Sequence, residues 1–165
     1  ATFRVVLPAL DPASARLELQ TSDRRRFPPE IRSRDALVLL VDDEPVMQRS
    51  LKRVLKRAGF EVEVRGDGES ALERMGRAPT VELLVLDLDL PGINGLETLR
   101  RLRAQAVTTP VICISGHRDA MDRRNSSELG IHTFLAKPFS THEFISVAHE
   151  ALKGGNDDAD TTIAP

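Results

Sequence analysis

Hydrophobic residues in the middle of the chain occur in two alternating patterns. Short continuous or alternating runs predict strands, whereas recurrence every three or four residues predicts helices with one buried face. The runs predict strands at 37–41, 62–64, 83–86, 111–114 and 133–135. The longer spacing predicts helices at 47–58, 71–75, 96–102, 121–129 and 144–152.

This regular alternation of strand and helix predicts the fold class. Each strand, helix and next strand form a right-handed crossover, which places successive strands parallel in one sheet. We therefore expect an α/β protein with a (βα)5 order, in which helices cover both faces of a doubly wound, five-stranded parallel sheet. Ligands of such sheets bind beyond the carboxyl ends of the strands, so the residues at those ends carry the functional information.

Two of the predicted helices carry further local detail. Ser140 and Glu143 have the spacing of a capping box, which predicts that the last helix begins between them. The segment 123–127 is poor in helix formers and has no apolar stripe. We expect the fourth helix to be short, shifted or mobile.

Composition narrows the class of protein. The 165 residues include 25 acidic and 23 basic side chains, a net charge of -2, which argues against nucleic-acid binding by this chain. No apolar run approaches the roughly 20 residues needed to cross a bilayer, so no membrane segment is expected. A lone cysteine, Cys113, and the lack of a signal-peptide pattern favour a cytoplasmic location, although a longer parent protein could be membrane-anchored.

Changes in composition divide the chain into three parts. Residues 1–35 contain four prolines and the cluster Arg24 to Arg26, and are interpreted as an N-terminal extension or linker. Residues 36–153 contain all the predicted strands and helices and form the folded domain. Residues 154–165 are small, acidic or polar, so we expect a disordered tail.

Chemically distinctive side chains follow four of the five predicted strands. Taken alone, the first acidic pair would be a solvated loop or a helix cap, but the whole set converges on one edge of a parallel sheet. Three carboxylates that converge repel one another unless a cation lies between them, and hard oxygen ligands suit Mg²⁺. These residues are Asp42 and Asp43, Asp87, Ser115 and Lys137.

These residues together resemble the receiver domain of two-component response regulators, a flavodoxin-like fold typified by the bacterial chemotaxis response regulator. The resemblance covers residues 36–153 and rests on the segments VDDE, LDLDLPGINGLE, ISG and AKPF, and on Phe134 three residues before the lysine. It implies that Asp87 accepts a phosphoryl group from a histidine of a histidine kinase or histidine phosphotransfer domain. It also leaves a homodimer open.

The resemblance further implies a set of metal ligands. Asp43 and Asp87 would bind Mg²⁺, or Mn²⁺, directly, and Asp42 would act largely through water. The backbone carbonyl of Asp89 would complete the protein ligands. Such a site suits phosphoryl transfer, which needs positioning and charge neutralisation more than covalent help from the protein.

The remaining site residues are assigned to charge neutralisation and switching. Lys137 would neutralise the phosphoryl oxygens, and Ser115 would donate a hydrogen bond to one of them. Movement of Ser115 would open space into which Phe134 rotates. Because Phe134 lacks the hydroxyl of the more familiar tyrosine, we expect switching by ring burial without a hydrogen-bonded signal.

Asp89 and His117 lie two residues beyond Asp87 and Ser115, respectively. Each could reach the water that hydrolyses the phosphoryl group, or the shell of the metal. We therefore consider both as modulators of dephosphorylation. Exposed loop side chains are the equally weighted alternative.

The N-terminal residues have a second resemblance. Thr2 to Pro8 alternate and end in proline, which is similar to the closing strand of the ATP-binding domain of sensor histidine kinases. The resemblance implies that residues 1–8 end a kinase domain and that the parent protein is a hybrid histidine kinase. An expression remnant or a floppy arm is the alternative interpretation. Nothing else in the chain supplies a kinase core, so its own chemistry is limited to gaining and losing a phosphoryl group.

Two other functions fit parts of the pattern. Asp87 and Asp89 resemble the nucleophile and acid/base pair of haloacid-dehalogenase-type phosphatases. That class needs its metal-binding acidic pair after the lysine, whereas here the pair precedes it at Asp42 and Asp43. A degenerate receiver used only for interactions is disfavoured because all the site positions are chemically intact.

Overall fold

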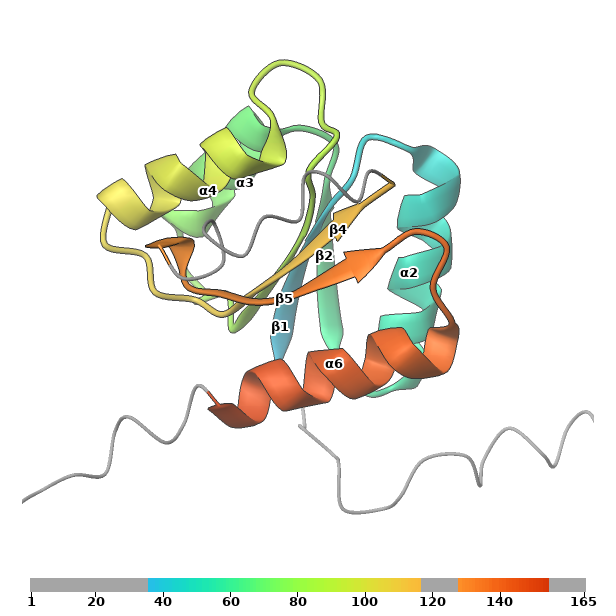
Figure 1. Ribbon diagram of the computed structural model, residues 1–165. Coiled ribbons are helices and arrows are strands. Elements are labelled where there is room, and N and C mark those ends of the chain that lie inside the picture. The colour runs from blue at the N-terminus through green and yellow to red at the C-terminus, as the bar shows by residue number, and fades with distance from the viewer. Residues whose placement is uncertain (1–35, 117–127, 155–165) are drawn as a thin grey trace, which may run out of the picture. The chain divides into compact units, whose positions relative to one another are not determined.

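A computed structural model describes residues 36–116 and 128–154, which form a five-stranded sheet and four helices (Figure 1). The strand order is β2-β1-β3-β4-β5, and every neighbouring pair is parallel. This confirms the predicted fold class. The elements in chain order are β1 (Leu37–Val41), α2 (Pro45–Arg57), β2 (Glu61–Arg65), α3 (Gly68–Met75), β3 (Leu83–Asp87), α4 (Gly95–Ala104), β4 (Val111–Ser115), β5 (Ile131–Ala136) and α6 (Thr141–Gly154).

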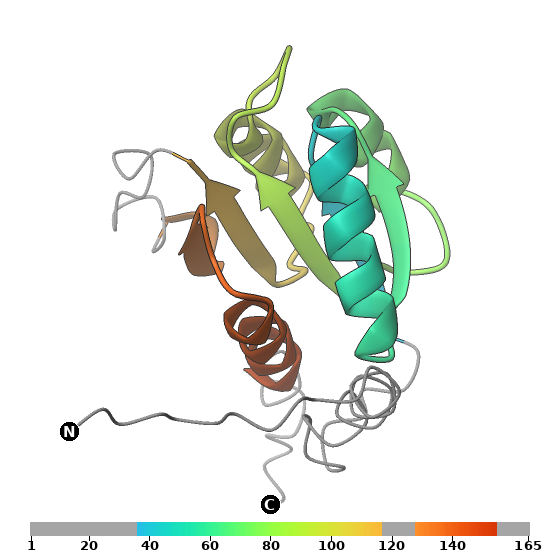
Figure 2. The same ribbon diagram turned by 90° about the vertical axis from the view of Figure 1, so that its right-hand side faces the viewer.

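The helices cover both faces of the sheet, with α3 and α4 on one face and α2 and α6 on the other (Figures 1 and 2). Residues along each central strand alternate between the two hydrophobic clusters. In β1, for example, Val38 and Leu40 face α2 and α6, whereas Leu39 and Val41 face α3 and α4. Strands buried on both faces require continuous apolar sequence, which explains why these strands could be recognised as unbroken runs.

Local sequence signals begin the helices. Asp67 caps α3 by accepting the amide of Ser70 at 2.7 Å, and Asn94 caps α4 in the same way. The predicted capping box precedes α6: the hydroxyl of Ser140 accepts the amide of Glu143 at 3.1 Å, and the Glu143 carboxylate accepts the amide of Ser140 at 3.5 Å. Caps of this kind satisfy amides that have no partner within the helix.

The boundaries differ from the expectations in small ways. Strand β5 is longer than predicted, and α6 includes Gly154, the first residue of the predicted tail. Residues 117–127 lie outside the described residues, and with them most of the expected fourth helix at 121–129. Residues 1–35 and 155–165 also lie outside, with the interpretations placed on them. In the part of the chain that is described, no helix is long and apolar enough to span a membrane.

The register of the strands brings their carboxyl ends to one edge of the sheet. Val41 pairs with Leu86, and Asp87 pairs with Ile114. Ser115 pairs with Ala136, directly before Lys137. The polar residues that end or follow β1, β3, β4 and β5 therefore lie beside one another, although they are far apart in the sequence.

Candidate functional site

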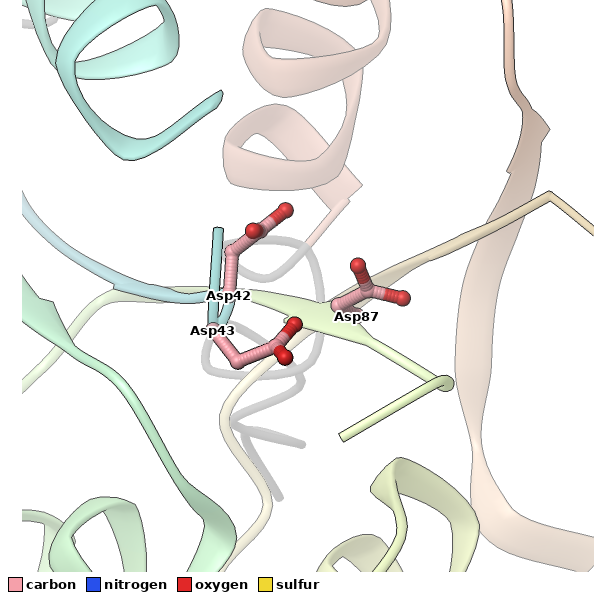
Figure 3. Close-up of side chains that lie close together, drawn as sticks. All are labelled: Asp42, Asp43 and Asp87. Carbon is pink, nitrogen blue, oxygen red and sulfur yellow. The ribbon is translucent and has the colours of Figure 1, made fainter. Parts of the chain in front are cut away.

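Three carboxylates meet at the carboxyl ends of β1 and β3 (Figure 3). Asp42, Asp43 and Asp87 each offer an oxygen, and these oxygens lie within 4.8 Å of one another. Asp42 and Asp87 are 1% and 2% exposed, whereas Asp43 is exposed. The donor set is entirely oxygen and is open to solvent on the side of Asp43, so it fits Mg²⁺, which binds few protein ligands and keeps several waters.

Lys137 is the cation that balances two of these carboxylates. Its ammonium nitrogen lies 2.5 Å from Oδ2 of Asp87 and 3.4 Å from Oδ2 of Asp42. Burial lowers the pKa of Lys137, but the hydrogen bond and charge of Asp87, with those of Asp42, outweigh it and the pKa is raised. Lys137 therefore stays charged at neutral pH.

Asp42 is held by the start of helix α2. Its Oδ1 accepts the amide of Glu44 at 2.8 Å, and the side-chain amide of Gln48 donates to its carbonyl at 2.5 Å. Burial raises the pKa of Asp42, and the charge of Asp87 adds to this, while the Glu44 amide and Lys137 oppose it. The ionised form of this buried carboxylate is thus held at a cost in free energy.

Both oxygens of Asp87 are engaged. Oδ1 accepts the backbone amide of Asp89 at 2.9 Å, and Oδ2 accepts Lys137. These two contacts fix the orientation of the carboxylate at the end of β3. An oriented, buried carboxylate beside a fixed cation suits nucleophilic attack on a phosphorus centre, because the charge that develops is already balanced.

The side chain of Asp89 turns toward the end of β4. Its Oδ2 accepts the hydroxyl of Ser115 at 3.3 Å and the amide of Gly116 at 3.3 Å. Ser115 is fully buried and Asp89 is exposed. The structure thus joins two residues that we considered separately as a switch and a modulator, while His117 lies outside the described residues.

Phe134 lies half-buried on β5 and packs against the cluster that faces α3 and α4. Its register partner is Cys113, two residues before Ser115 on β4. Side chains at paired positions of parallel strands, and at positions two apart, share a face. Ser115 and Phe134 therefore lie on the same face of the sheet, as the proposed coupling between them requires.

Cys113 itself is an ordinary core residue. It is fully buried, and burial raises the pKa of its thiol to about 12. The reactive form of cysteine is the thiolate, which this environment suppresses.

Gly95 also belongs to the site, although the sequence pattern did not single it out. A Cβ atom there would lie 2.3 Å from the carbonyl oxygen of Asp87 and 2.7 Å from Cα of Leu88. Its amide also donates to the carbonyl of Leu88 at 3.2 Å. The start of α4 thus packs directly on the backbone that carries Asp87. In the sequence, Gly95 is recognisable only as the residue after Asn94. Asn94 is explained by its role as the cap of α4, but capping does not require a glycine at the next position.

Several curated proteins are similar to this chain. It is 38% identical over 109 residues to the transcriptional regulatory protein TrcR of Mycobacterium tuberculosis, covering 66% of this chain and 42% of that protein. It is 39% identical over 116 residues to the transcriptional regulatory protein CpxR of Escherichia coli, covering 70% of this chain and 49% of that protein. The match thus spans about half the length of these relatives, or less.

Solved structures agree with this similarity. The chemotaxis protein CheY4 of Vibrio cholerae superposes with a TM-score of 0.66 at 26% identity, covering 72% of this chain and 99% of that one. The response regulator protein TrrA of Thermotoga maritima, solved in complex with Mg²⁺ and BeF, gives 0.64 at 27% identity, covering 70% and 98%. The sequence pattern of the response regulator receiver domain matches residues 38–149. The chain therefore belongs to the response regulator receiver domain family, and contains the receiver domain of a two-component system.

Proposed function

We propose that Asp87 is the phosphoacceptor, and that it takes a phosphoryl group from a phosphohistidine of a histidine kinase or histidine phosphotransfer domain. An oxygen of Asp87 attacks phosphorus, the P–O bond forms as the P–N bond breaks, and the histidine nitrogen keeps the electron pair. The observation that carries this proposal is the buried Asp87 carboxylate 2.5 Å from the Lys137 ammonium, beside two further carboxylates.

The same site is proposed to hold Mg²⁺ or Mn²⁺. Asp43 and Asp87 would be direct ligands, Asp42 would act largely through water, and the carbonyl of Asp89 would complete the set. The bound ion would neutralise charge on the transferring group. Lys137 would also neutralise charge on the transferring group, since it already contacts Asp87 and Asp42.

The switch is proposed to run from Ser115 to Phe134. Once Asp87 is phosphorylated, the Ser115 hydroxyl donates to a phosphoryl oxygen and moves, and the Phe134 ring turns into the space that it leaves. The common face of Ser115 and Phe134 supports this order of events. Asp89 and His117 are proposed to modulate dephosphorylation. We expect hydrolysis of the phosphoryl group to be slower by roughly several-fold when either residue is changed to alanine.

A direct experiment tests the phosphoacceptor. The chain is incubated with Mg²⁺ and a small acyl phosphate, and its intact mass is measured. We expect one phosphoryl group on the unchanged chain and none on Asp87→Asn. Asp67→Asn is the matched control, because Asp67 caps α3 outside the acidic group and asparagine also caps helices. Equal labelling of Asp87→Asn would refute the proposal.

The class of the longer protein that contains this receiver domain is also proposed. The resemblance of residues 2–8 to a kinase strand supports a hybrid histidine kinase, with this receiver located in the cytoplasm. The relatives named above are transcriptional regulatory proteins, which instead favours a regulator as the parent. The coding sequence on either side of this segment distinguishes the two: a kinase core upstream supports the first, and a DNA-binding domain downstream supports the second.

Phosphatase chemistry of the haloacid dehalogenase type is not favoured. The acidic pair that joins Asp87 comes from residues 42 and 43, before the lysine in the sequence. The receiver family pattern also covers the whole site. Steady turnover of a phosphomonoester by the chain would reverse this conclusion.

A further inference from the structure

The Asp89 carboxylate occupies a pair of hydrogen-bond donors at the end of β4. One oxygen, Oδ2, accepts both the Ser115 hydroxyl and the Gly116 amide at 3.3 Å. A Cβ atom on Gly116 would lie 3.9 Å from the same oxygen, so the carboxylate rests in ordinary contact against this turn. Two donors converging on one oxygen form a small cradle for an anion.

This cradle lies next to the phosphoacceptor. Asp87 is the register partner of Ile114, which directly precedes Ser115. The backbone amide of Leu88 donates to the carbonyl of Ile114 at 2.9 Å, so the chain leaving β3 runs beside the chain leaving β4. Oxygens of a phosphoryl group on Asp87 would therefore lie near the same two donors, the Ser115 hydroxyl and the Gly116 amide.

One hydroxyl and one amide each carry a single hydrogen, so neither can serve two acceptors fully at once. Ser115 is completely buried, so its hydroxyl is shielded from solvent. Asp89 lies two residues after Asp87, and its carboxylate contacts the turn beside Asp87. A phosphoryl group on Asp87 would therefore be near a second negative charge, and like charges repel. A phosphoryl oxygen and the Asp89 carboxylate would therefore draw on the same two hydrogens.

We propose that Asp89 is a positioning residue whose carboxylate competes, as a tethered anion, with the phosphoryl group on Asp87 for the donors of Ser115 and Gly116. This inference rests on the proposed function of Asp87. In the unphosphorylated chain Asp89 holds the cradle and stabilises the inactive arrangement of Ser115. Phosphorylation switches the domain only if the phosphoryl group displaces Asp89. The free energy needed for this displacement weakens the binding of the phosphoryl group by the site.

The test is an equilibrium measurement with beryllofluoride, a phosphoryl mimic, at saturating Mg²⁺. The chain has no tryptophan or tyrosine, so binding is followed by fluorine NMR and by the amide resonance of Gly116. We expect Asp89→Ala to bind beryllofluoride about tenfold more tightly than the unchanged chain, because charge-assisted hydrogen bonds are the strong ones. Asp89→Asn keeps an acceptor without the charge, and should give an intermediate affinity.

A second background separates competition from simple repulsion. Ser115→Ala removes one of the two donors for which Asp89 and the mimic compete, so the gain from Asp89→Ala should shrink in this background. Glu150→Ala, which removes an exposed carboxylate on α6, is the control and should leave the affinity unchanged.

The outcomes are distinct. Equal affinities of Asp89→Ala and the unchanged chain, or weaker binding by Asp89→Ala, overturn the inference while leaving the phosphoacceptor in place. An equal gain in both Ser115 backgrounds means that charge alone acts and also overturns the competition. Binding by none of the proteins, together with no acyl-phosphate labelling of Asp87, removes the proposed function and the inference with it.

Discussion

Lys137 and Asp87 form the closest charged contact of the site, with 2.5 Å between Nζ and Oδ2 although 50 residues separate them in the sequence. Asp87 is the last residue of β3 and Lys137 directly follows β5. These strands are not neighbours in the sheet, so the lysine reaches past the end of β4. The same ammonium lies 3.4 Å from Asp42. One cation thus balances the two buried carboxylates.

Loss of this cation is predicted to disable phosphorylation. In Lys137→Met, the phosphoryl oxygens lose a fixed positive charge, and removal of one such electrostatic partner typically costs about 10²–10³-fold in rate. We expect labelling by a small acyl phosphate to slow by about 10²-fold, measured by intact mass against time. Lys137→Arg, which keeps the charge but changes its shape, should be affected less. Similar rates for Lys137→Met and the unchanged chain would contradict the assigned role.

The Asp42 carboxylate is predicted to lower the free energy of unfolding in the absence of Mg²⁺. It is buried beside Asp87, and burial raises its pKa, so its charge is disfavoured in the folded state. We expect Asp42→Asn to raise the free energy of unfolding by roughly 1 kcal/mol in metal-free urea titrations followed by circular dichroism.

Added Mg²⁺ should reverse this order, because an ion that binds only the folded state stabilises it by mass action. The unchanged chain should gain more stability from Mg²⁺ than Asp42→Asn does, and Asp67→Asn should gain as much as the unchanged chain. An equal gain for all three proteins would place Mg²⁺ elsewhere.

Alanine at position 95 is predicted to destabilise the fold and to disturb the backbone of Asp87. The new Cβ would lie 2.3 Å from the carbonyl oxygen of Asp87, and backbone must move to relieve such a clash. We expect Gly95→Ala to lower the free energy of unfolding by roughly 1–3 kcal/mol and to slow labelling of Asp87.

Gly76→Ala is the matched control, since a Cβ at that position meets its nearest neighbour at 3.8 Å, an ordinary contact. It should change stability little. Comparable losses in the two variants would mean that the close approach to Asp87 has no special role.

His149 is predicted to make stability depend on pH. It is buried on α6 against Phe60, with ring centroids 4.9 Å apart, and among the described residues its Nδ1 has no hydrogen-bond partner. Burial lowers its pKa, and the charge of Lys153 adds to this. The unfolded chain therefore takes up a proton near pH 6.5, before the folded chain does, and stability falls as the pH drops below about 6.5.

His149→Leu should remove this part of the pH dependence and raise stability at neutral pH by roughly 1 kcal/mol, because no unpartnered polar atom stays buried. Urea titrations between pH 5 and pH 8 measure both effects. His142→Gln, an exposed histidine on the same helix, is the control. An unchanged slope in His149→Leu would show that other groups cause the pH dependence.

The order of strands and helices could be predicted from sequence because it depends on local periodicity. Strands β1, β3 and β4 are buried on both faces, so each appears in the sequence as a continuous run of apolar residues. The approximate convergence of Asp42, Asp87 and Lys137 followed as well, since parallel strands bring all their carboxyl ends to one edge. Asp43 joined the group because it directly follows Asp42.

The tertiary structure decided which side chains pair at that edge. Nothing local to Asp89 indicates that its carboxylate turns to Ser115 and Gly116, because that choice depends on the register of β3 against β4. The need for glycine at 95 likewise arises from the approach of α4 to the backbone of Asp87. Periodicity reports whether a residue is buried, whereas contacts of a few ångströms depend on how strands and helices distant in sequence are placed against one another.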